Sequence, residues 1–278
     1  MKVLVYGNGE SRKDWNIKKK YDGFTTWGCN AIYRDCKVDN LVAIDYEIQQ
    51  EIYKSGYPIR HDSWFADWSI LDNFDPEFVK VSYSPEHIFE TPKRNNNSGY
   101  GWYDRTKCVI QGKEYKTAEK NFQDMITKFP HLDKNDVKVK CFKNVGLYIT
   151  WVEDEDKIKN IEFPKDWCAG ATAIHLACQQ GAKEVYMLGF DMSSYDIPLN
   201  NIYKGTDNYL PSESKGFSTD NWVNQLVQVF KEYSDTQFYW VDDKNKSCIA
   251  FQKKYDNELL RKNVERINYK KLDKVCQV

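Results

Sequence analysis

The sequence lacks any run of apolar residues close to the roughly 20 that a helix needs to cross a bilayer, so no membrane span is predicted. Eight cysteines occur, but no two of them form the C-x-x-C pair that is typical of structural zinc sites. The four histidines include no H-x-x-x-H pair. We therefore predict neither a bound metal nor another resident cofactor.

The sequence also lacks an excess of charge of either sign. Its net charge is -1 with 29% charged residues, which argues against a protein that coats nucleic acid through bulk positive charge. Met1 runs directly into a strand-like segment, which is not typical of a signal peptide. Because free thiols suit a reducing compartment, we predict a cytoplasmic protein.

What the chain does contain is a repeated pattern of strand, turn and helix. Short, mostly apolar runs are typical of strands buried on both faces of a parallel sheet. The 278 residues are enough for one large α/β domain, and we predict a single α/β domain over residues 1–278 that is built on a Rossmann-like parallel sheet. The predicted strands are 2–6, 24–29, 41–44, 184–188 and 238–241, and the predicted helices are 46–55, 170–180 and 221–233.

A long stretch, from about 60 to 163, does not continue this pattern. Helical spacing of apolar residues predicts a helix at 117–129, and apolar runs predict strands at 79–83, 137–142 and 147–152. We therefore expect an inserted subdomain here.

A polar loop at about 192–216 is a candidate lid, because loops of this length in compact domains are usually functional or disordered. Its Tyr203, Lys204 and Tyr209 have the chemistry to stabilise a departing phosphate without a metal. A simple solvated loop is the alternative. The basic tail at 253–274 predicts a helix, which either holds nucleic acid or is an ordinary solvated surface.

A Gly7-Asn8-Gly9 turn follows the first predicted strand. Glycines there let a ligand approach the backbone, and the N–H groups that follow, through Ser11, can hold a phosphate. A dinucleotide fingerprint needs a third glycine at position 12, where Arg12 stands, so a mononucleotide or sugar nucleotide is favoured over NAD. A tight strand-to-helix turn without a ligand is the alternative.

Short polar side chains end the other predicted strands. Asn30 and Asp45 follow the second and third strands, and Asp191 follows the strand at 184–188. Because parallel strands share one carboxyl edge, these side chains are expected in the same crevice as Asn8. Asp191 is a candidate to bind a sugar hydroxyl or to act as a base. Turn formation or capping explains such residues equally well.

Two histidines are weighed as alternative bases. His175 lies within the predicted helix at 170–180, where a hydrogen-bonded core histidine is the competing explanation. His61 precedes Asp62, but neighbours on an extended strand point to opposite sides.

These segments together resemble bacterial sialyltransferases of glycosyltransferase family 42 and the related motility accessory proteins of flagellin glycosylation. The resemblance rests on the turn at 7–11, on Cys29-Asn30, on Asp45, on Ala169-Gly170 and on the stretch from Gly181 to Asp191. It implies a glycosyltransferase-A-like variant of the Rossmann-like sheet, covering about a third of the chain in the family's order and spacing.

The resemblance further implies transfer of a sugar from a nucleotide-activated donor, a CMP-sugar or another nucleotide sugar, without a metal. The implied nucleotide- and substrate-binding residues are Gly7, Asn8, Gly9, Ser11, Asn30, Ala169 and Gly170. The implied catalytic residues are Asp45, Asp191, Tyr203 and Tyr209.

The chain departs from the family in four respects. The family has a histidine base in its lid, but no histidine follows His175 here. Asp166 replaces a basic residue of the family and Ala169 replaces a serine, while Asp45 stands where the family has an asparagine. The general base, the donor sugar and the acceptor, whether a glycan, a protein or modified DNA, therefore stay open. Members of the family are often homo-oligomers.

Two other functions are compatible with the same scaffold. One is a non-catalytic protein that binds a nucleotide or a nucleic acid. The other is a phage glycosyltransferase that modifies DNA. The chain is rich in Lys, Asn and Tyr, which is typical of a protein from an AT-rich genome and favours a phage source.

Overall fold

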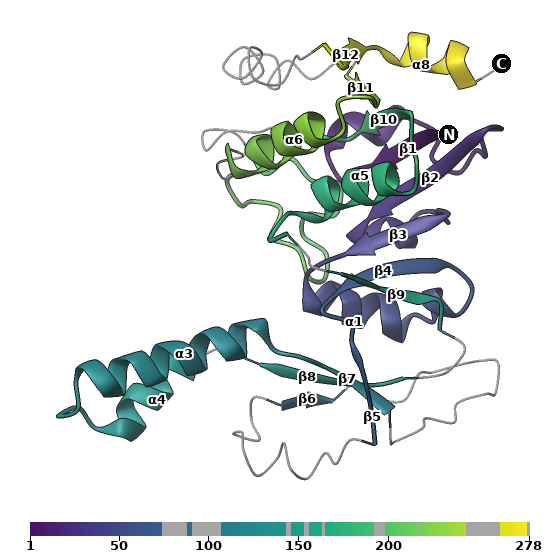
Figure 1. Ribbon diagram of the computed structural model, residues 1–278. Coiled ribbons are helices and arrows are strands. Elements are labelled where there is room, and N and C mark those ends of the chain that lie inside the picture. The colour runs from purple at the N-terminus through teal and green to yellow at the C-terminus, as the bar shows by residue number, and fades with distance from the viewer. Residues whose placement is uncertain are drawn as a thin grey trace.

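The computed structural model describes residues 1–73, 88–90, 107–142, 146–152, 156–162, 165–191, 198–216, 218, 220–242 and 262–276, with the backbone alone at 113–116. Within these residues, eight strands form an all-parallel sheet in the order β12-β11-β10-β1-β2-β3-β4-β9 (Figure 1). This confirms the predicted α/β, Rossmann-like class. The strands are β1 (Lys2–Tyr6), β2 (Phe24–Cys29), β3 (Asn40–Ala43), β4 (Asp62–Ala66), β9 (Ile158–Ile161), β10 (Glu184–Leu188), β11 (Gln237–Val241) and β12 (Val264–Ile267).

Helices cover both faces of this sheet, which explains why the central strands β1 and β10 are mostly apolar. Val3 and Val5 of β1 join the core beneath α5 and α6, and Figure 1 shows these two helices side by side over one face. Leu4 and Tyr6 point the other way, into the core beneath α1 and α8. The helices are α1 (Tyr46–Lys54), α5 (Ala169–Gln179), α6 (Asp220–Glu232) and α8 (Tyr269–Cys276), with short 3-10 helices η1 (Glu10–Asp14), η2 (Asn30–Arg34) and η3 (Tyr57–Ile59).

The strand order reverses between β1 and β10. From β1 the chain builds β2, β3 and β4 on one side, and after β10 it builds β11 and β12 on the other. In open α/β sheets such a switch point leaves a crevice outside the carboxyl ends of the two strands, and ligands bind there.

A second, mixed sheet is inserted between β4 and β9, which confirms the predicted subdomain. Its order is β5-β7-β8-β6, and α3 and α4 project from it as an arm (Figure 1). The elements are β5 (Ile70–Asp72), β6 (Ile88–Glu90), β7 (Lys107–Gln111), α3 (Lys113–Lys128), α4 (Lys134–Phe142) and β8 (Leu147–Trp151).

Two predicted elements are wrong. The strand predicted at 137–142 is helix α4, in which Val137 and Phe142 are buried while Val139 is 70% exposed. The alternation of valine and lysine is typical of a strand, but α4 packs against α3 as a helix. The helix predicted at 253–274 is wrong where Val264–Ile267 form β12, whose Val264 and Ile267 pack against the sheet. Its end from Tyr269 onward is helical, as part of α8, and 253–261 lie outside the described residues. The strand predicted at 79–83 lies outside the described residues.

A buried polar network joins the two sheets through α1. Gln49 of α1 donates to the carbonyl of Ala66 at 3.2 Å, and Gln111 of β7 donates to that carbonyl at 3.1 Å and to the Gln49 side chain. Gln50 donates to the hydroxyl of Thr150 in β8 at 2.7 Å. Because all of these amide groups are buried, each requires a partner, and the network fixes the subdomain against α1.

Replacing Gln111 with leucine should lower the free energy of unfolding by about 3 kcal/mol, since it leaves the side chains of Gln49 and Gln50 short of buried partners. Urea denaturation followed by circular dichroism measures this loss. The matched control is Gln228→Leu on the exposed side of α6, which should change the value by less than about 0.5 kcal/mol. Equal stability of the two variants would contradict a structural role for the network.

Candidate functional site

The turns that leave β1 and β10 lie in direct contact at the switch point. The Gly7 N–H donates to the Leu188 carbonyl at 2.8 Å, and the Gly9 N–H donates to the Gly189 carbonyl at 2.9 Å. A side chain on Gly9 would place its Cβ 2.6 Å from the Asp191 carboxyl carbon, and Gly189 has a φ of +70°. The glycines of the first turn therefore allow two backbones to meet, in addition to any role toward a ligand.

Asp191 is bound by the turn that follows Gly9. The Ser11 N–H donates to one carboxylate oxygen at 2.8 Å, and the Ser11 hydroxyl donates to the other. The Glu10 N–H donates to the side chain of Asn200 at 2.8 Å. Burial raises the pKa of Asp191, while the hydrogen bonds from Ser11 oppose that shift. The N–H groups that we predicted for a phosphate thus already serve acceptors of the protein.

A cavity of about 150 Å³ opens beside these turns, and we call it the central cleft. It is bounded by the ends of β1, β2 and β10, the start of α5 and part of α6. The structure gathers here most of the residues that we predicted to bind a nucleotide or substrate. Those that line the central cleft are Gly7, Asn8, Gly9, Asn30, Ala169, Gly170 and Asp191.

Among the described residues, two buried acceptors that line the central cleft have no hydrogen-bond partner. They are the Oδ1 atoms of Asn8 and Asn30, which follow β1 and β2. The Asn8 amide nitrogen, by contrast, donates to the Tyr209 hydroxyl at 3.2 Å. A buried acceptor without a donor is costly, and a ligand that donates hydrogen bonds would remove that cost.

Strained backbone also marks this edge of the sheet. Four described residues other than glycine have left-handed backbones, with φ between 52° and 63°. Asn30 lines the central cleft, while Asp67 and Asn208 line neighbouring cavities. The fourth, Asn73, directly follows strand β5 of the small sheet. Such strain concentrates at functional sites, where the surrounding structure holds it in place.

The central cleft continues into two outer cavities of about 390 and 420 Å³. Trp222 of α6 lines all three. Asp45 is exposed at the end of β3 and lines both outer cavities, whereas Asp166 and Lys165 line only the larger. Neither His61 nor His175 lines any of the three, so the structure does not bring the histidine alternatives to the cleft.

The two predicted lid tyrosines have different environments. Tyr203 is 5% exposed, and its hydroxyl donates to Asp35 at 2.5 Å while accepting from Arg12 at 3.0 Å. It lies outside the cleft. The Tyr209 hydroxyl accepts from Asn8 and from the Ala31 N–H at 3.3 Å, and Tyr209 lines an outer cavity. Burial raises the pKa of Tyr209 to about 12, so it keeps its proton at neutral pH.

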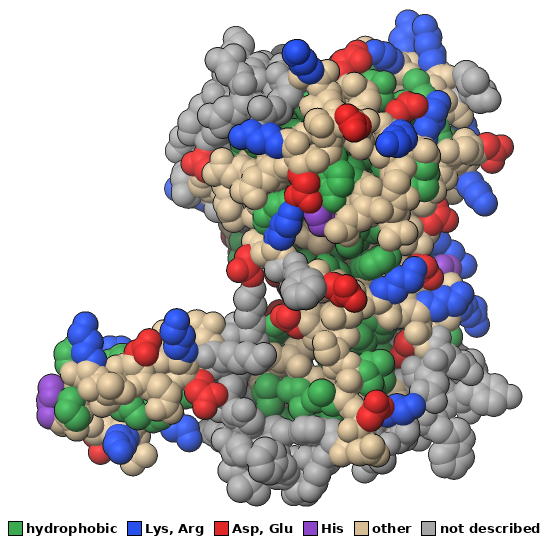
Figure 2. Space-filling model, viewed as in Figure 1, with side chains coloured by type: hydrophobic (Ala, Val, Ile, Leu, Met, Phe, Trp, Pro, Cys, Tyr) green, Lys and Arg blue, Asp and Glu red, His purple; other side chains and the backbone are tan. Residues whose placement is uncertain are grey.

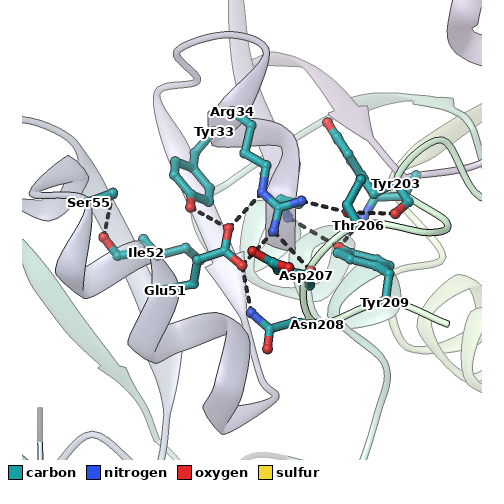
Figure 3. Close-up of polar contacts among 12 residues, drawn as sticks. Tyr33, Arg34, Glu51, Ile52, Ser55, Tyr203, Thr206, Asp207, Asn208 and Tyr209 are labelled. Atoms are coloured by element: carbon teal, nitrogen blue, oxygen red, sulfur yellow. Dashed lines mark hydrogen bonds and ion pairs between the residues drawn. The ribbon is translucent and has the colours of Figure 1, made fainter. Parts of the chain in front are cut away.

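The described part of the predicted lid, 198–216, is an irregular loop that is fastened to α1 and η2 (Figure 3). Glu51 of α1 accepts from Arg34 at both oxygens, at 2.6 and 2.5 Å, and from the Tyr33 hydroxyl at 2.5 Å. Asn208 of the lid donates to the same carboxylate at 2.6 Å.

Arg34 extends this contact further along the lid. Its guanidinium donates to the Thr206 hydroxyl at 2.8 Å and to the Asp207 carbonyl at 3.0 Å. It also lies 5.8 Å from the ring centre of Tyr209. The Arg34–Glu51 pair, here called the lid latch, therefore holds Tyr209 beside the cleft.

Several residues of the cleft carry no sequence signal that we recognised. Trp222 and Cys168 belong to helices whose orientation depends on packing, and Asn200 lies in the lid. Among the described residues, no group of three His, Cys, Asp or Glu side chains is placed to hold a metal ion. In the same part of the chain, no helix is long and apolar enough to cross a membrane.

Comparisons with known proteins return no match: no family model fits the sequence, and neither a similar curated protein nor a similar solved structure was found. The resemblance to glycosyltransferase family 42 therefore depends on the short segments quoted above. The function that it implies stays a prediction, and the geometry of the cleft has to support any proposal.

The lid latch should weaken in acid. Burial raises the pKa of Glu51, but hydrogen bonds from Arg34, Tyr33 and Asn208 outweigh this and leave it below its usual value. A carboxylate with a lowered pKa stabilises the folded lid above the unfolded-state pKa, and this contribution disappears as the pH falls through the folded-state pKa. Hydrogen exchange, expressed as protection factors for residues 203–209, should show falling protection between about pH 5 and pH 3.

Glu51→Gln should lower that protection about tenfold at pH 7 and flatten its pH dependence, because a charge-assisted interaction is lost. Glu213→Gln, the same change at an exposed position of the lid, is the control and should match the parent protein. Protection in Glu51→Gln that still falls with pH would show that another group controls the lid.

Proposed function

We propose that this protein binds a nucleotide-activated sugar in the central cleft and transfers the sugar to an acceptor. The observation that carries the proposal is the pair of unpartnered buried oxygens, on Asn8 and Asn30, in a cavity at the switch point of a parallel sheet. A nucleotide offers matching donors, since its base carries amino or N–H groups and its ribose carries hydroxyls.

The start of α5 is the element best suited to a phosphate. Ala169 and Gly170 line the central cleft where the positive end of the helix dipole lies. Carboxylates outnumber cations in the larger outer cavity, where Asp45, Asp67 and Asp166 accompany Lys165. One helix terminus in an acidic setting favours a donor with a single phosphate, such as a CMP-sugar, over a diphosphate.

Tyr209 would assist the departure of that phosphate. Because it stays protonated at neutral pH, its hydroxyl can donate to the oxygen on which charge develops. Asp191 is less suited to act as a base, since both of its oxygens accept hydrogen bonds from Ser11. Asp45, exposed at the edge of the cleft, contacts the sugar or the acceptor in this proposal.

A non-catalytic nucleotide-binding protein is the second candidate. The hydrogen bonds that Asp191 accepts from Ser11 favour this candidate, because a residue that we predicted as catalytic holds a turn instead. Binding of nucleic acid is less favoured: on the face shown in Figure 2 basic and acidic side chains are interspersed, and the outer cavity is acidic. Release of the free nucleotide, which is CMP when the donor is a CMP-sugar, or formation of a transfer product separates the two candidates.

Thermal unfolding with a panel of nucleotides tests the donor. The panel consists of CMP, CDP, UDP, GDP, ADP, NAD and S-adenosylmethionine. We expect at least one of these to raise the Tm with or without magnesium, and we expect CMP to raise it most. A ligand at 100 times its Kd stabilises the folded state by about 2.7 kcal/mol, which such a scan detects. A Tm that no member of the panel shifts would overturn the proposal.

Asn30→Ala should weaken nucleotide binding at least tenfold, because the ligand loses its acceptor in the cleft. The substitution also places alanine at a left-handed φ of 52°, which lowers stability by itself. Asn73→Ala introduces the same strain, at a φ of 57°, outside the cleft and is the matched control. Isothermal titration of both variants with the best nucleotide should show a loss of affinity in Asn30→Ala alone.

A further inference from the structure

A cavity of about 570 Å³ lies under the lid, on the side of α1 that faces the small sheet. Residues of α1, β6, β8 and the lid form its walls, and we call it the lid cavity. It shares Glu47 and Asn208 with the outer cavity that adjoins the central cleft. A molecule bound in the lid cavity would therefore lie next to a sugar that extends outward from the central cleft.

One wall of the lid cavity is a stacked pair of aromatic rings. Phe89 of β6 and Tyr148 of β8 lie 5.2 Å apart between ring centres, at an angle of 23°. Phe89 is 48% exposed, so the pair presents a flat apolar surface to the cavity. The C–H face of a sugar ring matches such a surface, while its hydroxyls reach the polar groups around it.

The charges around the lid cavity oppose an anionic ligand. Its carboxylates belong to Glu47, Glu90, Asp207 and Glu51, of which Glu51 is paired with Arg34. Lys54 is the one lysine or arginine among the described residues that line it. Phosphates of DNA or RNA would be repelled by this excess of negative charge. Carboxylates do, however, accept hydrogen bonds from neutral hydroxyls, which a carbohydrate supplies in number.

Glu47 has a position that no other described carboxylate shares. It lines the lid cavity and both outer cavities of the cleft, whereas Asp45 lines only the outer cavities and Glu90 only the lid cavity. It lies in the first turn of α1, and the Tyr148 hydroxyl donates to its Oε1 at 2.9 Å. This contact orients the carboxylate at the boundary between the two spaces.

We propose that the lid cavity binds a neutral carbohydrate acceptor and that Glu47 is the general base that activates it, an inference that rests on the proposed transferase function. Glu47 takes the proton from the acceptor hydroxyl as the hydroxyl oxygen attacks the anomeric carbon of the donor sugar. The new glycosidic bond forms while the bond from that carbon to the phosphate oxygen breaks, and the electron pair leaves with the phosphate. Glu47 then releases its proton to water.

Binding of the acceptor is tested first, with the nucleotide that the thermal scan identifies present at saturation. Saturation-transfer NMR with methyl glycosides of galactose, glucose, N-acetylglucosamine and mannose should detect at least one as a ligand. Phe89→Ala should weaken its binding at least tenfold, and Phe89→Tyr, which keeps the ring, should restore most of it. The Tm shift with nucleotide should be the same in both variants, which shows that the cleft is intact.

The role of Glu47 is tested with that glycoside as acceptor. Glu47→Gln should lower kcat at least 100-fold with the KM of the donor within about twofold, because the acceptor hydroxyl loses the group that takes its proton. In Glu47→Ala, which leaves room for it, added formate, a small external base, should restore part of the rate. Glu213→Gln is the matched control, being the same change outside the cleft and the lid cavity.

The two levels of the proposal fail in different ways. Nucleotide binding without binding of any methyl glycoside would overturn the assignment of the lid cavity and leave the donor site standing. Salt-sensitive binding of a DNA duplex that Phe89→Ala abolishes would overturn the carbohydrate class. An unchanged kcat in Glu47→Gln would overturn the assignment of the base, whereas the absence of any nucleotide shift would remove the transferase function itself.

Discussion

The contact between the turns after β1 and β10 is the constraint on which the rest of the site depends. β1 has neighbours on both sides, so its turn cannot move away from the turn after β10 without breaking their shared hydrogen bonds. The carboxylate of Asp191 then fixes the start of η1 through Ser11. With both turns held, the ends of β1 and β2 and the start of α5 enclose a cavity of defined shape.

A buried cation extends this constraint to the lid. Arg12 is 2% exposed, and its Nε donates to the Gly7 carbonyl at 2.6 Å. Its Nη2 donates to Tyr203 and lies 4.0 Å from Asp35. Arg12 occupies the position of the third glycine in a dinucleotide fingerprint, and a guanidinium there ties the turn to the lid instead of allowing close helix packing. The lid is therefore anchored from below by Arg12 and from the side by the lid latch.

The sequence predicts those elements of the fold whose structure depends on a single local segment of the chain. Strands β1, β2 and β10 have the predicted bounds. Burial on both faces requires the mostly apolar runs of β1 and β10, whereas β2 is marked by aromatic and β-branched residues that favour a strand. β4, β9 and β12 contain charged or amide residues and join the sheet only through their neighbours, so periodicity does not identify them. Asn8 and Asn30 could be placed together because parallel strands share an edge. The burial of Tyr203 and the exposure of Glu47 depend on how α1 and the lid pack, which no local pattern records.

Helix α1 joins the cleft, the lid and the subdomain in one rigid element. Asp45 precedes it at the end of β3, Glu47 and Glu51 lie one turn apart on the face of the lid cavity, and Gln50 reaches the small sheet. A shift of the subdomain or a release of the lid would therefore act on the same two turns of helix that carry Glu47. Under the proposed function, a loss of the lid latch would therefore also disturb Glu47, the carboxylate at the boundary of the cleft.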